Sequence, residues 1–133
     1  MKNIDTICVI DDNDVYQFVM KNSINKLNPN IKILAYLNGE EGIVSLKKMI
    51  EDHAPLPDVI LLDINMPIMD GWEFMNEFIK IKSQLPHVMP IYLTTSSLDA
   101  SDIDKAKRYE DITGFLSKPI DRHTLLKITQ MQQ

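Results

Sequence analysis

Polar side chains follow or end four short apolar segments of the chain, and together they could carry out chemistry. They are Asp11 and Asp12, then Asp63, Thr95 and Lys118. If the segments are neighbouring parallel strands, all five side chains converge on the edge where the carboxyl ends of the strands lie. Three close carboxylates raise each other's pKa unless a cation neutralises them, and oxygen ligands suit Mg²⁺ or Mn²⁺. Because Lys118 and Thr95 can bind phosphoryl oxygens, the set predicts phosphoryl transfer to a carboxylate, with Asp63 as the nucleophile.

The stretch from Val59 to Gly71 organises this prediction. Residues 59–62 are apolar and two of them are β-branched, which indicates a strand buried on both faces that stops at Asp63. A rigid turn follows, because Pro67 fixes its own φ and Gly71 can take a backbone conformation closed to other residues. We therefore expect Asp63 at the carboxyl end of a buried strand, followed by a loop that holds its shape.

Strand and helix signals alternate along the whole chain. Strand-like apolar runs lie at 7–10, 31–37, 59–62, 89–95 and 112–117, and helical spacing of apolar residues is found in 15–27, 43–50, 74–85, 103–109 and 125–128. We expect Asn38 and Asp121 to cap their helices. The first helix has an imperfect apolar stripe of Val15, Phe18, Val19, Ile24 and Leu27. Five strands and five helices joined by short loops predict an α/β fold, a doubly wound parallel sheet with helices on both faces.

Composition limits the class of protein. The 133 residues fit one domain, 1–133, with the hydrophobic fraction of 44% that an ordinary soluble globule has. The net charge of −5 argues against a nucleic acid partner, since domains that bind phosphate backbones are usually basic. The single cysteine, Cys8, cannot form an internal disulfide and indicates a reducing compartment. Without a signal peptide or a run long enough to span a membrane, the sequence predicts a cytoplasmic location and no membrane partner.

Four motifs, in this order and at these strand ends, make the chain resemble the response-regulator receiver domains of two-component signalling. They are I-C-V-I-D-D from Ile7, L-L-D-I-N-M-P-I-M-D-G from Leu61, Y-L-T-T-S-S from Tyr92 and F-L-S-K-P-I from Phe115. The resemblance covers the whole chain. It implies the flavodoxin-like receiver fold with strand order 2-1-3-4-5, which puts the site at the switch point between the first and third strands.

The resemblance implies a role for each residue at this edge. Asp63 would accept a phosphoryl group from a histidine kinase or a histidine phosphotransfer protein in a phosphorelay. Asp12 and Asp63 would ligate Mg²⁺ directly, Asn65 would offer its backbone carbonyl, and Asp11 would act through metal-bound water; Mn²⁺ can substitute. Thr95 and Lys118 would contact the phosphoryl group, and the bond between Lys118 and Pro119 would be cis.

The resemblance also implies a switch that controls the binding of a downstream protein. Thr95 would move toward the phosphoryl group while Phe115, which stands where tyrosine is often found, turns inward. The surface of the fourth helix, fifth strand and fifth helix would then change shape. Asn65 and Ser97 occupy positions that tune autodephosphorylation in the family.

We expect a stand-alone receiver that is a monomer or a weak homodimer and has no output domain. It would catalyse only its own phosphorylation and dephosphorylation. Three alternatives to this interpretation remain. The chain could be a receiver cut from a longer response regulator or a hybrid histidine kinase. A magnesium phosphatase of the haloacid dehalogenase type would need a second aspartate two residues after Asp63, where this chain has Asn65. A flavin-binding module is disfavoured because the acidic run 11–14 would repel the flavin phosphate.

Overall fold

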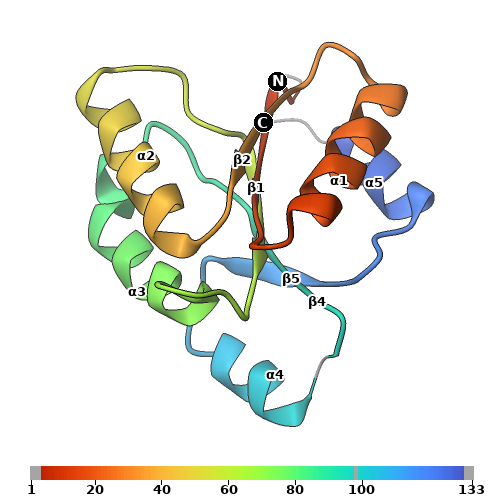
Figure 1. Ribbon diagram of the computed structural model, residues 1–133. Helices are drawn as coiled ribbons and strands as arrows, with labels where there is room; N and C mark the ends of the chain where they lie inside the picture. Colours follow the sequence, from red (N-terminus) through yellow and green to blue (C-terminus); the bar gives the residue numbers. More distant parts are fainter. Residues whose placement is uncertain (1–3, 98, 131–133) are drawn as a thin grey trace.

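Strands and helices alternate along residues 4–97 and 99–130, which the computed structural model describes (Figure 1). The strands are β1 (Thr6–Ile10), β2 (Lys32–Tyr36), β3 (Val59–Asp63), β4 (Ile91–Thr95) and β5 (Ile112–Ser117). The helices are α1 (Asp14–Leu27), α2 (Gly39–Glu51), α3 (Gly71–Ile81), α4 (Ala100–Ala106) and α5 (Arg122–Thr129), with a 3₁₀ turn, η1 (Lys82–Gln84), after α3. The predicted alternation is confirmed.

The strands form one parallel sheet in the order β2-β1-β3-β4-β5. Helices α1 and α5 lie on one face of this sheet, and α2 and α3 lie on the other (Figure 1). This arrangement confirms the predicted doubly wound α/β fold and its strand order. It also brings the carboxyl ends of all the strands to one edge.

The core has two halves because alternate side chains of each strand face opposite sides of the sheet. Ile60 and Leu62 of β3 belong to the half that includes Phe74 and Phe78 of α3. Val59 and Leu61 belong to the other half, with buried residues of α1 and α5. As predicted, all five residues of β3 are buried, so Asp63 ends a strand that is fixed from both sides.

The helices begin at side-chain caps. Asn38 accepts the N–H of Glu41 at 2.9 Å, and Asp121 accepts the N–H of Thr124 at 2.7 Å, as the sequence predicted. Asp70 forms a full capping box with Glu73 at the start of α3. The cap fixes where α3 begins, directly after the loop that follows Asp63.

The predicted apolar stripe of α1 is wrong over its first two turns. Ile24 is buried and Leu27 is half-buried, but the three earlier members are exposed by 68%, 66% and 51%: Val15, Phe18 and Val19. The buried positions of α1 are instead Gln17, Met20 and Ile24. The helix is therefore rotated so that a polar residue faces the sheet near the site.

Gln17 explains this rotation. Its Nε2 atom donates to the backbone carbonyls of Val9, Asp11 and Tyr36 at 2.9, 3.2 and 3.0 Å. The carbonyl of Tyr36 also accepts the N–H of Asp11 at 3.0 Å, as the two lone pairs of a carbonyl oxygen allow. Gln17 therefore adds hydrogen bonds at a buried position where an apolar side chain could make none.

Several element ends also differ from the prediction. β4 begins at Ile91 rather than at residue 89, because Pro90 has no N–H to donate to a neighbouring strand. α3 ends at Ile81, so Leu85 lies beyond η1 instead of on that helix. α4 ends at Ala106 and does not reach Tyr109. None of the helices within residues 4–97 and 99–130 combines the length and the apolar character that crossing a bilayer requires.

Candidate functional site

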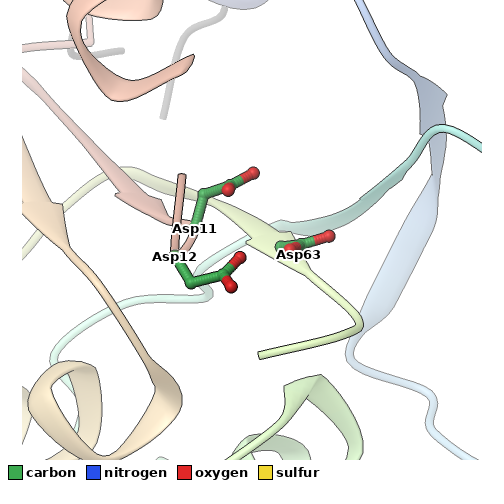
Figure 2. A group of neighbouring side chains, drawn as sticks. All are labelled: Asp11, Asp12 and Asp63. Atoms are coloured by element: carbon green, nitrogen blue, oxygen red, sulfur yellow. The ribbon is translucent and has the colours of Figure 1, made fainter. Parts of the chain in front are cut away.

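Three carboxylates meet at the carboxyl edge of the sheet, where β1 and β3 are neighbours (Figure 2). Asp11 and Asp12 directly follow β1, and Asp63 is the last residue of β3. One carboxylate oxygen from each residue lies within 4.8 Å of the other two. The convergence expected from the strand ends is therefore present, and these oxygens are a donor set of the kind that Mg²⁺ prefers.

Lys118, directly after β5, places its ammonium group against two of these carboxylates. Its Nζ atom is 2.5 Å from Asp11 Oδ2 and 3.1 Å from Asp63 Oδ1. Burial lowers the pKa of Lys118, but the hydrogen bond and charge of Asp11, with those of Asp63, outweigh burial and hold the pKa above its ordinary value. Lys118 is therefore charged, and within the described residues it is the cation that pairs with these acids.

Asp11 and Asp63 use their oxygens differently. Asp11 is fully buried and also accepts the N–H of Asn13 at 3.0 Å. In Asp63, Oδ1 faces Lys118 and accepts the N–H of Ile64 at 3.0 Å, whereas Oδ2 accepts no hydrogen bond from the residues that the structure describes. Asp63 thus has one oxygen held in place and one oxygen open for reaction.

The charge balance at Asp63 is incomplete. Burial raises the pKa of its carboxyl group above the ordinary value, the charge of Asp11 raises it further, and Lys118 offsets only part of this. Asp12 acts in the same direction as Asp11. A further cation beside Asp63 would therefore favour its ionised form.

Backbone contacts shape the loop between β3 and α3. A Cβ atom on Gly71 would lie 2.6 Å from the carbonyl oxygen of Asp63, so a glycine is needed for α3 to begin this close to the acidic site. The described glycines have no positive φ, which corrects the prediction that Gly71 uses a backbone conformation closed to other residues. The positive φ, 70°, belongs to the exposed Ile68, and the N–H of Met69 donates across it to the carbonyl of Pro67 at 2.7 Å.

Thr95 lies at the edge of the site but is bonded within its own loop. It is the last residue of β4 and is buried. Its hydroxyl group donates to the carbonyl of Ser97 at 3.0 Å and accepts the N–H of Ser97 at 3.1 Å. No hydrogen bond within the described residues joins Thr95 to Asp63 in this structure.

The other predicted site residues surround this edge. Asn65 is exposed in the loop after β3, and Phe115 is half-buried on β5, where it packs against the core. The peptide bond between Lys118 and Pro119 is cis, the form that the resemblance implies. Within the described residues the side chains of Asn65 and Phe115 make no hydrogen bond to the three carboxylates, whereas Lys118 bonds to two of them.

Sequence reasoning missed one side chain of the site, Tyr16. Its ring covers the ammonium group of Lys118, with Nζ 4.7 Å from the ring centroid. Burial, followed by the charges of Asp11 and Asp63, raises the pKa of its phenol group. A second stripe at helical spacing, which begins at Tyr16, could have revealed it: Tyr16, Met20, Ile24 and Leu27.

The sequence of this chain is similar to sequences of known proteins. The model of the response regulator receiver domain family matches residues 7–130. A protein-glutamate methylesterase/protein-glutamine glutaminase 2 of Photobacterium profundum is 30% identical over 117 residues, which are 80% of this chain and 27% of that protein. The sensor histidine kinase CheAY of Helicobacter pylori is 27% identical over 127 residues, which are 93% of this chain and 14% of the kinase.

Among solved structures, a two-component response regulator from Cytophaga hutchinsonii has a TM-score of 0.83 and 27% identity, with 96% of this chain and 95% of that chain covered. A two-component response regulator from Legionella pneumophila has a TM-score of 0.80 and 26% identity, with 95% of each chain covered. The chain thus spans nearly all of each solved regulator but less than a third of either curated relative.

Proposed function

This chain belongs to the response regulator receiver domain family of two-component signalling, and on that premise we propose that Asp63 accepts a phosphoryl group from a phosphohistidine donor. The observation that carries the proposal is the meeting of Asp11, Asp12, Asp63 and Lys118 at the carboxyl edge of the sheet. In the reaction an oxygen of Asp63 forms a bond to phosphorus while the bond from phosphorus to the imidazole nitrogen breaks. The electron pair of the broken bond returns to that nitrogen, and an aspartyl phosphate results.

Asp63 is a better acceptor than its two acidic neighbours. Asp11 is fully buried and bonded to Lys118 and Asn13, so its oxygens are committed. Asp12 is exposed in the loop after β1, where no strand holds it. Asp63 is 8% exposed, ends the buried strand β3 and keeps Oδ2 without a hydrogen bond from the described residues. It is therefore held in place and open on one side.

The acidic cluster fits a divalent cation, and receiver domains bind Mg²⁺ at an acidic pocket. Three carboxylate oxygens lie within 4.8 Å of one another. The pKa of Asp63 is raised first by burial and then by the charge of Asp11, and Lys118 offsets only part of this rise. We propose that Asp12 and Asp63 ligate Mg²⁺ directly, with the backbone carbonyl of Asn65, and that Asp11 acts through metal-bound water. When bound, the ion supplies positive charge against the oxygens of the transferred group.

Lys118 and Thr95 would bind the phosphoryl group itself. The Lys118 ammonium already lies 3.1 Å from Asp63 Oδ1, so it can pair with a phosphoryl oxygen after a small movement. Thr95 would give up its contact with Ser97 and donate its hydroxyl hydrogen to another phosphoryl oxygen. Phe115 would then turn inward and change the surface of α4, β5 and α5, where a downstream protein binds. Asn65 and Ser97 would tune the loss of the group.

The proposed donor is a histidine kinase or a histidine phosphotransfer protein. Helix α1 has three exposed apolar side chains, the first of them three residues after Asp12: Val15, Phe18 and Val19. They would give an incoming donor protein a surface beside the site. One relative with a matching region is itself a sensor histidine kinase. We propose that this chain is a signalling domain that catalyses only its own phosphorylation and dephosphorylation, and that it acts in the cytoplasm, with which the unpaired, buried Cys8 agrees.

Intact mass measured after incubation with acetyl phosphate and Mg²⁺ tests the proposal. We expect one added phosphoryl group that is lost at alkaline pH, absent from Asp63→Asn and absent when a chelator is present. Asp104→Asn is the matched control, since Asp104 is exposed on α4 and its ion pair with Lys107 is at the surface. A wild-type chain that stays unmodified at saturating donor and metal, or an Asp63→Asn chain that is modified equally, would overturn the assignment.

A further inference from the structure

Tyr16 makes a contact in the site that the proposed reaction leaves without a role. The Nζ atom of Lys118 lies 4.7 Å from the centroid of its ring, within the range in which an aromatic face attracts a cation. The same ammonium group faces Asp11 at 2.5 Å and Asp63 at 3.1 Å, and the Lys118 side chain is 17% exposed. We propose that Tyr16 is a positioning residue, whose ring holds the Lys118 ammonium at Asp63 and limits the access of water to it.

The fold fixes this ring relative to the carboxylates. Asn13 caps α1, and its Oδ1 atom accepts the backbone N–H of Tyr16 at 3.0 Å. The next residue, Gln17, donates to the carbonyls of Val9 and Asp11 at the end of β1. The first turn of α1 is thus bonded to the strand end that carries Asp11, so Tyr16 and Asp11 reach Lys118 from one rigid unit.

The ring, and not the hydroxyl group, makes the contact. The Tyr16 hydroxyl is buried and has no hydrogen-bond partner among the described residues. A buried hydroxyl without a partner costs free energy and contributes no bond. Tyr16→Phe keeps the aromatic face and removes that group, whereas Tyr16→Leu keeps an apolar side chain but has no aromatic face. The two variants therefore separate the ring from the hydroxyl.

This inference rests on the proposed function in one respect, because the position of Lys118 matters for phosphorylation only if Asp63 is the acceptor. Without the ring, Lys118 keeps its carboxylate partners but one side of its ammonium opens to water. From the strength of partly buried cation–π contacts, we expect Tyr16→Leu to slow phosphorylation by roughly three- to tenfold. Tyr16→Phe should stay within about twofold of the wild type.

The first measurement needs no phosphoryl transfer and uses the metal-free protein. A trace of acetic anhydride is added at one fixed pH, and mass spectrometry gives the acetylation of Lys118 relative to the exposed Lys47 in the same molecules. Tyr16→Leu should raise this ratio by roughly three- to tenfold, as expected for a lost cation–π contact, while Tyr16→Phe leaves it unchanged. Asn22→Ala is the control, because Asn22 is exposed on the same helix and its replacement should leave the ratio unchanged.

The second measurement is the rate of phosphorylation by acetyl phosphate and Mg²⁺, followed by intact mass. If the wild type accepts no phosphoryl group, the proposed function fails, but the acetylation ratios still decide whether Tyr16 positions Lys118. Equal ratios in the wild type, Tyr16→Phe and Tyr16→Leu would overturn the inference, and so would a Phe variant as impaired as the Leu variant, because the hydroxyl would then be responsible. Circular dichroism checks folding, and Tyr16→Met replaces Tyr16→Leu if the latter unfolds.

Discussion

β3 and β5 bring Asp63 and Lys118 to the same edge of the sheet, yet the two strands differ in burial. All five residues of β3 are buried, whereas none of the six residues of β5 is. The helices differ in the same way, since α3 buries six of its eleven residues and α4 buries only Ala106. The comparison teaches that Asp63 belongs to a tightly packed region, while Lys118 follows a region that can rearrange at a lower cost.

This division suits a receiver whose signal leaves through α4, β5 and α5. A phosphoryl group on Asp63 would act first on Thr95, the last residue of β4, and on Lys118, which directly follows β5. Phe115 packs against the core but is only half-buried, so a change in its packing would cost less than a change at a fully buried side chain. On the proposed function, the acceptor would stay fixed and the output surface would be the part that moves.

Two glycines give the largest expected difference between these regions. The Cβ of Gly71→Ala would lie 2.6 Å from the backbone oxygen of Asp63 and 3.0 Å from Ile64 Cα, so the backbone would have to shift. We expect a loss of about 3 kcal/mol in the free energy of unfolding, measured by urea denaturation. Gly114→Ala on β5 is the matched control, since its new Cβ would meet only Tyr92, at 3.8 and 3.9 Å.

The Gly114→Ala variant should stay within about 0.5 kcal/mol of the wild type, because contacts at that distance are ordinary. Equal losses for the two variants would mean that β5 is packed as tightly as the start of α3. In that case the contrast between the two regions would not hold.

The ionised carboxyl group of Asp63 should lower the stability of the metal-free protein. Burial and the charge of Asp11 raise the pKa of Asp63, so the folded state holds the Asp63 proton more tightly than the unfolded state does. The ionisation of Asp63 therefore costs stability, and this cost appears as the pH rises from the acid range to neutral. Asp63→Asn should raise the unfolding temperature of the metal-free protein at pH 7, and the gain should disappear as the pH falls through the carboxyl range.

Asp104→Asn serves as the control for a lost negative charge, since Asp104 is exposed. A gain at Asp63→Asn that does not change with pH would contradict the electrostatic explanation. Addition of Mg²⁺ should stabilise the wild type more than Asp63→Asn, because the variant lacks one of the proposed ligands.

Strain within the fixed region gives a smaller expected effect. Ile68 is β-branched, has a φ of 70° and is 73% exposed, so no described packing offsets its unfavourable backbone conformation. Ile68→Gly should raise the free energy of unfolding by about 1 kcal/mol, the relief of strain exceeding the entropy that glycine adds to the unfolded chain. Chemical denaturation measures it, and Ile79→Gly on α3, where the backbone is helical, should instead destabilise. A loss of stability at Ile68→Gly would show that the strain is absent.

The sequence could predict which strand-end residues meet at the site but not which residues of the helices face it. The meeting of Asp11, Asp63 and Lys118 depends only on where apolar strands end and on their being parallel, and both follow from local patterns. The rotation of α1 depends on Gln17 bonding carbonyls of β1 and β2, one of them nineteen residues away in sequence. The apolar pattern carries no signal of that contact, so the stripe that begins at Val15 was preferred to the one that begins at Tyr16.

The loop after β3 shows the same limit. Its rigidity could be predicted from Pro67 and Gly71, but the reason for Gly71 is a close approach to the carbonyl of Asp63, which appears only when α3 is packed on the sheet. The positive φ fell on Ile68, a residue type that gives no signal of it in sequence. Local sequence patterns therefore predict the residues of the site, while tertiary contacts determine the conformation of the loop that holds them.

The attachment of α4 gives the smallest expected effect on stability and tests the looser region directly. Tyr109, just after α4, stacks on Trp72 of α3 and donates its hydroxyl hydrogen to Asn76 Oδ1 at 2.8 Å. Tyr109→Phe keeps the stack and loses this exposed bond, so the free energy of unfolding should fall by about 0.5 kcal/mol. Asn76→Ala should have a similar effect, and the double variant should add little to either change, because both remove one bond.

Hydrogen exchange distinguishes a local from a global loss. In Tyr109→Phe the amides of α4 should exchange faster while those of β3 keep their protection, because the lost bond fastens only a short helix with one buried residue. Equal acceleration in β3 would mean that α4 and the β3 core open as one unit. The surface proposed to carry the signal would then be as rigid as the acceptor, and phosphorylation of Asp63 would have to move both together.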